Sequence, residues 1–311
     1  MRSTLPLLAL LALAAAPPAA AEEAIEPLLS DADAARSHDY CSWRFALGDT
    51  EPDLPDFEAM LGESLELPEG STMEAVILAA AGTRVALATD GKKACRKTFE
   101  KGAQKDGQLY DKVLKSVSRR AARPTSDDPE IRRVQELIAR LWSEDQAARQ
   151  AYLGSRTDDE EGADFWARRL AVARATAVDD NSTSQIKKLL ETYDWIDRHR
   201  FGARFDQHAW ILVQHADDDP AFQALVLERM EKHLDNGGVR KEDYAYLFDR
   251  VAVNHDRKQR YGTQPDWECN DEGKLELRPL EDPENVDVRR AEMGLGPAEE
   301  ALAEMTRSVC G

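Results

Sequence analysis

Apolar side chains recur at helical spacing along most of the chain. Positions i, i+3, i+4 and i+7 lie on one side of an α-helix, so a stripe of apolar residues with this spacing predicts an amphipathic helix. Such stripes run through residues 109–117, 131–141, 165–173, 186–193, 222–230 and 244–251. Short turns join the helices predicted between residues 205 and 254, which favours packing side by side. The pattern predicts a mostly α-helical protein, an antiparallel helical bundle or array.

Polar residues mark where several of these helices begin. The dipeptide Asp-Pro precedes a helical stripe at Asp128-Pro129, Asp219-Pro220 and Asp282-Pro283. An aspartate at the N-cap accepts the free N–H groups of the first turn, and a proline at the next position has no N–H to leave unpaired. Each pair therefore predicts a helix start, and a last helix is expected to start at Pro297.

Two further cap signals and one interruption complete the helical pattern. Ser71 and Glu74 have the capping-box spacing, in which each side chain satisfies the other's free backbone N–H. Ser182 or Thr183 is expected to cap a later helix. Between residues 91 and 107 a basic segment punctuated by glycine interrupts the stripes, which predicts either a small positive patch or a solvated surface.

Extended character is found only after Tyr261. The stretch QPDWECNDEGKLELRPL holds two short extended runs around NDEG, a combination typical of a β-hairpin. We expect this hairpin at about residues 264–280, followed by the two terminal helices.

The chain divides into three regions. Residues 1–21 combine one positive charge, an apolar run and small residues, the pattern of a signal peptide that is removed on export. The apolar run is shorter than the roughly 20 residues that cross a bilayer. A polar turn cluster at residues 123–130 separates an N-terminal helical region, 22–125, from a helical domain, 126–311. We expect an exported protein, periplasmic or secreted.

The charge of the chain limits its partners. Lys and Arg number 41 against 59 Asp and Glu, a formal net charge of −18 at pH 7. Such an acidic balance repels nucleic acid and anionic lipid surfaces, and no segment after the signal is long and apolar enough to span a membrane. We expect no nucleic-acid partner and no membrane insertion, and the partner stays open, with an envelope protein as one alternative.

The cysteines predict a disulfide framework. There are four, and an even number in a chain bound for an oxidising compartment predicts two bridges. Three pairings are open, of which the local one joins Cys41 to Cys95 and Cys269 to Cys310. The second bridge would tie the hairpin to the C-terminal helix. None of the spacings resembles CxxC, which disfavours a thiol redox or zinc–cysteine site.

Residues 214–220, QHADDDP, form the densest group of candidate ligands and acid–base side chains. Asp219 is explained as an N-cap, and His215 at a helix C-terminus gains a favourable dipole interaction when protonated. Asp217 has no such explanation. His215 and Asp217 diverge at i and i+2, and His208 lies about 10 Å away along the helix, too far to share one metal ion. We expect neither a metal site nor a cofactor.

A second polar group follows on the next helix and in the segment NHDRKQRYGTQ. Histidine beside a carboxylate is the commonest acid–base pair. We predict a cleft in which His215 is the general base and Asp217 or Asp249 is the carboxylate that orients it. Arg250 would clamp an anion. Further ligand contacts are expected from Gln214, Tyr246, Gln259, Tyr261, Thr263 and Gln264.

The motifs leave several functions open. There is no GxSxG, no HExxH and no phosphate loop. Three interpretations of the two polar groups stay open. They form a structural hydrogen-bond network, a ligand cleft without chemistry, or the catalytic site of a hydrolase or transferase. The rival is a non-enzymatic helical interaction module of the cell envelope. An exposed apolar groove would favour the module, and convergence of His215, Asp249 and Tyr261 around a pocket would favour the cleft.

Four motifs in order resemble an uncharacterised bacterial family, often exported, with a domain of unknown function. They are AWILVQHADDDPAFQALVLERM, YAYLFDRVAVN, QRYGTQ and PLEDPENVDVRRAEMGLGP, and the resemblance covers roughly residues 126–300. It implies no activity. Its motif positions fall on Gln214, His215, Asp217, Gln223, Tyr244, Asp249, Arg250, Gln259, Tyr261, Gly262, Thr263, Gln264, Glu281, Asp282, Asp287 and Arg290. Much of this pattern is polar, which favours a site over packing alone.

Overall fold

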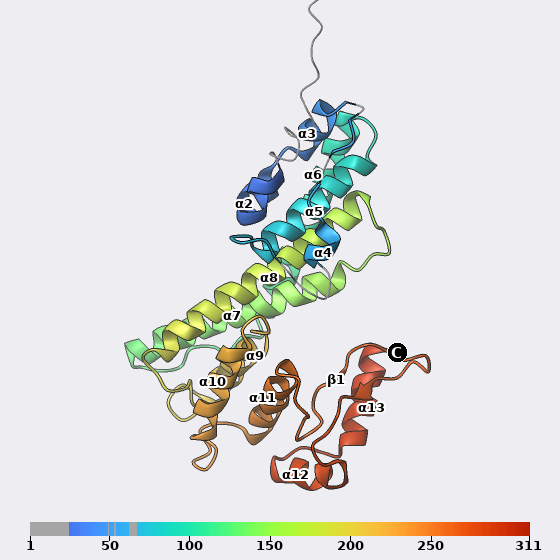
Figure 1. Ribbon diagram of the computed structural model, residues 1–311. Helices are drawn as coiled ribbons and strands as arrows, with labels where there is room; N and C mark the ends of the chain where they lie inside the picture. Colours follow the sequence, from blue (N-terminus) through green and yellow to red (C-terminus); the bar gives the residue numbers. More distant parts are fainter. Residues whose placement is uncertain (1–24, 49, 53, 62–66) are drawn as a thin grey trace, which may run out of the picture. The chain divides into compact units, whose positions relative to one another are not determined.

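The computed structural model describes residues 25–48, 50–52, 54–61 and 67–311, and the predicted signal peptide lies outside them (Figure 1). The described chain is mostly α-helical with one two-stranded sheet, which confirms the predicted fold class. The elements are η1 (Glu26–Ser30), α2 (Ala32–Ser37), α3 (Tyr40–Ala46), α4 (Phe57–Leu61), α5 (Met73–Ala88), α6 (Lys92–Ser118), α7 (Pro129–Gly154), α8 (Gly162–Leu190), α9 (Ala203–Gln214), α10 (Pro220–Glu231), α11 (Lys241–Asn254), β1 (Pro265–Asp266), β2 (Glu276–Leu277), η2 (Pro283–Asn285), α12 (Val286–Glu292) and α13 (Ala298–Val309). Within the described part, no helix has the length and apolar character that crossing a membrane requires.

The chain forms two compact units, each with its own apolar core. The described residues up to 107, together with 155–173, belong to the first unit, and residues 108–154 and 174–311 belong to the second. The chain passes from one unit to the other within α6, after the end of α7 and within α8. The polar turn cluster at residues 123–130 leads from α6 to the start of α7, inside the second unit. The division into domains near residue 125 stays a prediction.

The first unit packs around α5. This helix is buried over most of its length, and η1, α2, α3 and α4 all contact it. Its core also takes in Phe165 and Trp166 from the beginning of α8. The disulfide between Cys41 and Cys95 joins α3 to α6, so the structure has the local one of the three pairings that the sequence left open.

The absence of a side chain at Gly82 makes room for the ring of Tyr40. A Cβ atom at Gly82 would lie 2.3 Å from Cε2 of Tyr40. That ring is held by a hydrogen bond of 2.8 Å from its hydroxyl to the carbonyl oxygen of Ala35. Gly82 therefore lies in the interior of α5.

Replacing Gly82 by alanine is expected to lower the free energy of unfolding by about 2 kcal/mol, because the Tyr40 ring must move to admit the methyl group. Alanine on its own favours a helix by roughly 1 kcal/mol, so the loss is net of this gain. Urea unfolding measures it. The matched control is Gly107→Ala in α6, where a Cβ atom meets nothing within 4 Å. Stabilisation by both substitutions would contradict the steric argument.

The second unit is built from α7, the second half of α8 and the helices that follow. α7 contacts α9, and α9, α10 and α11 pack against one another (Figure 1). Strands β1 and β2 pair antiparallel, with Pro265 opposite Leu277, as the hairpin prediction requires. The Cys269–Cys310 disulfide ties the segment between the two strands to the end of α13, which confirms the second predicted bridge.

Two of the three Asp-Pro pairs cap helices as predicted. Asp128 Oδ1 accepts the backbone N–H of Glu130 at 2.8 Å, and Asp219 Oδ1 accepts that of Phe222 at 2.9 Å. Asp282 makes no such bond. Its Oδ2 accepts from the Asn285 side chain at 2.8 Å and from Arg289 Nη1 at 3.3 Å. The helix start predicted there is confirmed, since the 3₁₀ helix η2 begins at Pro283, but Asp282 does not supply the expected cap bond.

Two other local predictions, both of helix caps, are corrected. The cap of α5 is Thr72, which accepts from Ala75 N, while the N–H of Ser71 is used in a turn that bonds Pro68. Ser182 and Thr183 lie inside α8, which runs without a break from Gly162 to Leu190. Packing of the apolar positions on both sides of this polar stretch outweighs its local preference for a helix start.

The basic segment at residues 91–107 is also helical. It forms the first half of α6, which runs without a break from Lys92 to Ser118. Glycine in a helix costs only about 1 kcal/mol. Gly102 also has a packing reason, since a Cβ atom there would lie 2.7 Å from the carbonyl oxygen of Ala163 and 2.8 Å from the Trp166 ring.

Candidate functional site

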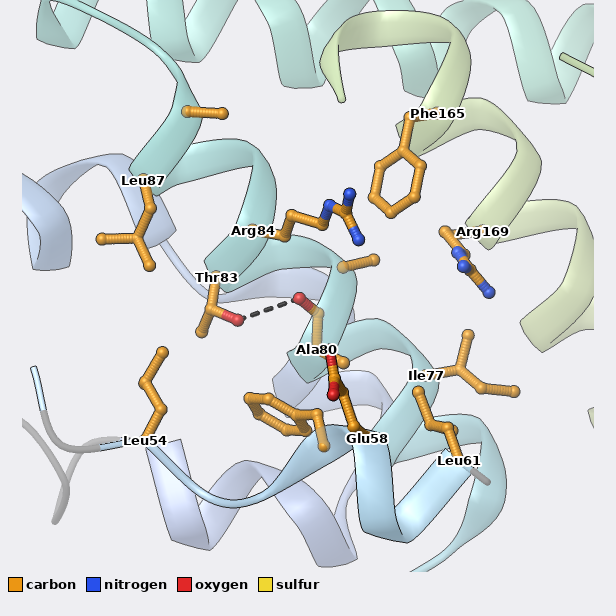
Figure 2. A pocket seen from close by; sticks show the side chains of 13 residues that line it. Leu54, Glu58, Leu61, Ile77, Ala80, Thr83, Arg84, Leu87, Phe165 and Arg169 are labelled. Atoms are coloured by element: carbon orange, nitrogen blue, oxygen red, sulfur yellow. Dashed lines mark hydrogen bonds between the residues drawn. The ribbon is translucent and has the colours of Figure 1, made fainter. Parts of the chain in front are cut away.

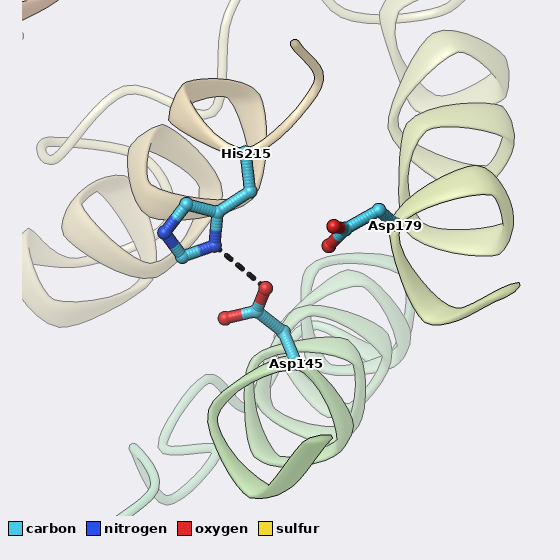
Figure 3. Close-up of side chains that lie close together, drawn as sticks. All are labelled: Asp145, Asp179 and His215. Carbon is cyan, nitrogen blue, oxygen red and sulfur yellow. Dashed lines mark hydrogen bonds and ion pairs between the residues drawn. The ribbon is translucent and has the colours of Figure 1, made fainter. Parts of the chain in front are cut away.

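His215 ends α9 and points its ring at a buried carboxylate. It is the C-cap residue, with φ −92° and ψ 0°, and its N–H bonds Ile211 O at 3.2 Å. Its Nδ1 lies 2.6 Å from Oδ1 of Asp145 on α7. Figure 3 shows the imidazole turned toward Asp145, with Asp179 of α8 on the other side of the group. Three helices thus bring together residues that are far apart in the sequence.

Arg149 links the two carboxylates of this group. It follows Asp145 by one helical turn, and its Nε lies 3.2 Å from Asp145 Oδ1 and 2.8 Å from His215 Nδ1. Its Nη2 lies 2.9 Å from both oxygens of Asp179. The side chain of Asp145 is only 1% exposed, so this network of charged side chains includes a buried carboxylate.

The network determines which nitrogen of His215 carries the proton. Burial alone would raise the pKa of Asp145, but the hydrogen bond and charge interactions with His215 and Arg149 hold it below its ordinary value. An ionised Asp145 needs a donor at 2.6 Å, which is Nδ1–H. Arg149 Nε then donates to Asp145 rather than to Nδ1. In the neutral ring this leaves the lone pair on Nε2.

A cavity of about 460 Å³ opens beside this histidine. His215 and Asp179 both line it, and its walls come from α8 and from the turn between α9 and α10. Five carboxyl groups and two lysine amines lie along its surface, so the cavity is acidic: Asp179, Asp180, Lys187, Lys188, Glu191, Asp218 and Asp219. Burial raises the pKa of Asp179 to about 7, with Arg149 acting in the opposite direction.

The same three side chains have the composition of a metal site. One ligand atom each from Asp145, Asp179 and His215 lies within 4.8 Å of the others. Two carboxylates and an imidazole suit zinc and similar ions. The guanidinium of Arg149, however, already contacts all three groups and compensates the carboxylate charge. A cation would have to displace it, so the arrangement favours acid–base chemistry over metal binding.

A second polar network lies next along the chain. Arg250 Nη1 contacts both oxygens of Asp217, at 2.8 and 2.7 Å, and Nε donates to Gln214 Oε1 at 2.8 Å. Asn254 donates to Gln223 Oε1, and Gln223 Nε2 in turn reaches Asp217. The predicted anion clamp Arg250 thus holds the carboxylate of the α9–α10 turn.

Asp249 of α11 belongs to neither of these two networks, and its carboxylate bonds the loop that follows α11. It is fully buried, and its carboxylate accepts the N–H groups of Arg260, Tyr261 and Thr263 at 2.8, 3.0 and 2.8 Å. The hydroxyl of Thr263 adds a fourth bond at 2.9 Å. Four donors fill the accepting positions of a carboxylate.

The glutamines of this loop also bond the backbone. Gln259 Oε1 accepts from the N–H of Gln264 at 2.7 Å, and Gln259 Nε2 donates to Arg278 O at 3.1 Å. Gln264 Nε2 contacts the carbonyl oxygen of Tyr246 at 3.4 Å. Arg290 of α12 also bonds this loop, since its Nη1 donates to the carbonyl oxygen of Tyr261 at 2.7 Å. The polar motif QxYGTQ therefore forms a loop wrapped around Asp249.

The predicted site residues therefore fall into two groups. His215, Asp217, Gln214 and Arg250 meet around the end of α9. The cavity beside His215 includes neither Asp249 nor Tyr261 among its walls. Tyr246 and Tyr261 both pack edge-on against aromatic rings, those of Trp210 and Phe248.

Asp145, Arg149 and Asp179 were missed by the sequence analysis. One signal was present. Asp145 follows Leu141 by four residues and Ile138 by seven, so a carboxylate continues the apolar stripe of α7. Nothing in the sequence around Asp179 distinguishes it from its neighbour Asp180, which lies on the same helix.

Comparison with known proteins gives one match. Residues 131–308 match a family of unknown function, DUF6624. No curated protein and no solved structure matches the chain significantly. The matched region holds every residue of the His215 network and of the Asp249 loop. Since it spans more than half of the 311 residues, the chain belongs to the DUF6624 family of unknown function.

Proposed function

We propose that this protein is an exported hydrolase that works by general acid–base catalysis, with His215 as the base. The observation that carries the proposal is the 2.6 Å contact between His215 Nδ1 and the buried Asp145, with the same ring lining a 460 Å³ cavity. A buried carboxylate that orients a histidine at a cavity is a recurrent acid–base arrangement. The signal-like N-terminus and two disulfides support export.

In the proposed reaction, Nε2 of His215 removes a proton from a water molecule as the water attacks the substrate. Asp145 holds the ring in the required tautomer and stabilises the imidazolium that forms. Arg149 keeps Asp145 in position, and Asp179 keeps Arg149 in position through its two contacts. The excess of carboxyl groups along the cavity favours a neutral or cationic substrate over an anionic one.

The other polar residues support this site in the proposal. Arg250 and Asp217 hold the turn that carries His215. Asp249 organises the QxYGTQ loop, and its candidate catalytic role passes to Asp145 because Asp145 is the carboxylate that contacts His215.

The test is a hydrolysis panel with the full-length mature protein and its His215→Gln variant. Chromogenic nitrophenyl esters, lysine nitroanilide and nitrophenyl glycosides supply neutral and cationic substrates. Loss of a general base costs about a hundredfold in rate, so His215→Gln is expected to lower the rate on any accepted substrate by about that factor. Asp145→Asn should lower it as well, because the ring loses its orienting charge.

Asp235→Asn is the control, since this exposed carboxyl belongs to the same unit but does not line the cavity beside His215. Its rate should equal that of the unmodified protein. Equal rates for His215→Gln, or no hydrolysis of any substrate in the panel, would contradict the proposal. Loss of activity in a chelator with recovery in zinc would identify a metal centre in its place.

The rival function is a non-enzymatic interaction module. One observation favours it, an apolar groove in the first unit. Co-purification of a single envelope protein, lost when the groove is filled and independent of His215, would support the module over the hydrolase.

A further inference from the structure

A second cavity adjoins the one beside His215. This α10 pocket has a volume of about 420 Å³, and its walls come from the end of α8 and from α10. Lys187, Glu191 and Asp219 line both cavities, so the two lie side by side within the second unit. A substrate held at His215 can therefore extend into the α10 pocket.

The α10 pocket is mainly apolar, in contrast to the cavity beside His215. Its apolar walls are Leu190 and Phe222, which are 5% and 4% exposed, together with Ala221 and Leu225. Leu225 is 44% exposed, so much of its side chain meets solvent. An apolar chain that covers these walls removes them from water, which is favourable in proportion to the area covered.

The basic side chains of the α10 pocket already have partners. Arg229 Nη1 donates to the carbonyl oxygen of Leu190 at 2.7 Å. The ammonium of Lys187 pairs with the carboxylate of Asp219, and it lies 5.3 Å from the centroid of the Phe222 ring. Neither side chain offers a free cation to a ligand carboxylate, so the pocket suits a chain without a charged end.

The boundary between the two cavities also favours an uncharged group. The Lys187–Asp219 pair lines both cavities and carries no net charge. Glu191 lines both as well and is exposed. Its carboxylate, with the acidic groups around His215, repels an anionic ligand. The arrangement therefore combines an acid–base histidine, a neutral boundary and an apolar pocket.

We propose that the α10 pocket is the substrate-chain subsite of the His215 site and that the substrate is an uncharged ester with an apolar acyl chain. This inference rests on the proposed hydrolase and names its substrate class. The ester group lies beside His215, and the acyl chain lies along Leu190, Phe222 and Leu225.

The reaction at this subsite is ester hydrolysis. Water attacks the ester carbonyl carbon as His215 Nε2 takes its proton, and the bond between that carbon and the alcohol oxygen breaks. The proton passes from His215 to the departing oxygen, which gives a carboxylic acid and an alcohol. The acid then ionises, and the carboxyl groups of the cavity repel it, which favours its release.

Hydrolysis of nitrophenyl acetate and nitrophenyl hexanoate by the mature protein tests the inference. The two esters share a leaving group and differ in the length of the acyl chain. Each buried methylene contributes up to about fourfold, so kcat/KM for the hexanoate should exceed that for the acetate by at least about tenfold. His215→Gln should lower both rates by about a hundredfold.

Three variants locate the acyl chain. Leu225→Asn should lower the hexanoate-to-acetate ratio of kcat/KM by at least about threefold, and Ala221→Leu, which fills the pocket, should lower it as well. Both residues are exposed, so the fold tolerates these substitutions. Leu87→Asn is the matched control, since Leu87 is 38% exposed and lines an apolar groove of the first unit (Figure 2). It should leave the ratio unchanged.

Binding of methyl hexyl ketone, which is uncharged and is not hydrolysed, tests the pocket separately from catalysis. In the isotope-labelled mature protein, the ketone should shift the backbone amide resonances of Ala221 and Leu225 in a saturable manner. Unshifted resonances would overturn the subsite.

The outcomes separate the subsite from the hydrolase. Hydrolysis that depends on His215, with equal kcat/KM for the two esters, would refute the subsite and leave the proposed hydrolase standing. Shifts at Ala221 and Leu225 without any hydrolysis would refute the hydrolase and support the pocket as a binding site for uncharged apolar chains. A ratio lowered by Leu87→Asn and not by Leu225→Asn would place the chain in the first unit, contrary to the inference.

Discussion

Replacing Asp249 by alanine is expected to lower the free energy of unfolding by about 4 kcal/mol. Three backbone N–H groups and one hydroxyl lose their only described acceptor in a fully buried position. Each unsatisfied buried donor costs about 1–3 kcal/mol, and the effects do not add fully because the loop relaxes. Urea unfolding at neutral pH measures the loss.

Asp249→Asn separates charge from shape. The amide keeps one accepting oxygen but directs an NH₂ group at backbone donors, so a loss of about 2 kcal/mol is expected. The control is Asp256→Asn, at an exposed position with φ 54°, a conformation that asparagine tolerates. If Asp249→Asn and Asp256→Asn unfold alike, the loop does not depend on this carboxylate and a ligand role for Asp249 becomes the better hypothesis.

The predictions that succeeded rest on local physical chemistry. The helix stripes and the Asp219 cap depend on residues that are close together in the sequence. The two disulfides were predictable for another reason, because four cysteines allow only three pairings. Asp219 contacts Phe222, three positions away. The hairpin joins two strands separated by residues 267–275, whereas its bridge joins cysteines 41 residues apart and is one of only three pairings that four cysteines allow. Spacing alone is enough for such features.

The site could be predicted only in part. The histidine was found because it stands out in QHADDDP, but its partner Asp145 is 70 residues away and only the tertiary fold brings them together. The polarity of Asp249, Gln259 and Gln264 was equally visible. Polarity does not say whether a side chain bonds a ligand or its own backbone, and here these three bond the loop.

A buried pair of aspartates makes stability depend on pH. Asp206 of α9 is 1% exposed and Asp243 of α11 is 4% exposed, and Oδ2 of each has no described hydrogen-bond partner. Asp206 Oδ1 accepts from Trp195 Nε1 at 2.8 Å. Burial raises the pKa of Asp206 to about 7 and that of Asp243 to about 6. The negative charge of Asp243 also raises the pKa of Asp206.

The charged groups around the pair have both signs. Arg198 and Arg240 favour the ionised forms, while Asp197 and Glu242 oppose them. Arg240 Nη1 lies 3.8 Å from Asp243 Oδ1. These charges do not offset burial, so the folded protein holds protons that the unfolded chain, with ordinary carboxyl groups, has released.

The sign of the effect follows from proton linkage. Between about pH 4 and pH 7 the folded state binds more protons than the unfolded state, so stability falls as the pH rises through this window. Below it both states are protonated and the stability contributed by the neutral carboxyls is fully present. For Asp206, a pKa raised to about 7 corresponds to a loss of roughly 4 kcal/mol at most, at about 1.4 kcal/mol per unit.

Asp206→Asn should remove most of this dependence, because the amide is neutral at every pH and its oxygen can still accept from Trp195. The variant is expected to be less stable than the unmodified protein, or equal to it, at pH 4 and more stable by about 2 kcal/mol or more at pH 8. Urea unfolding of both proteins at pH 4 and pH 8 measures this change in their relative free energies of unfolding. Asp235→Asn, at an exposed site in the same unit, should run parallel to the unmodified protein. A parallel curve for Asp206→Asn would mean that Asp206 is ionised in the folded state despite its burial, with Arg198 outweighing desolvation.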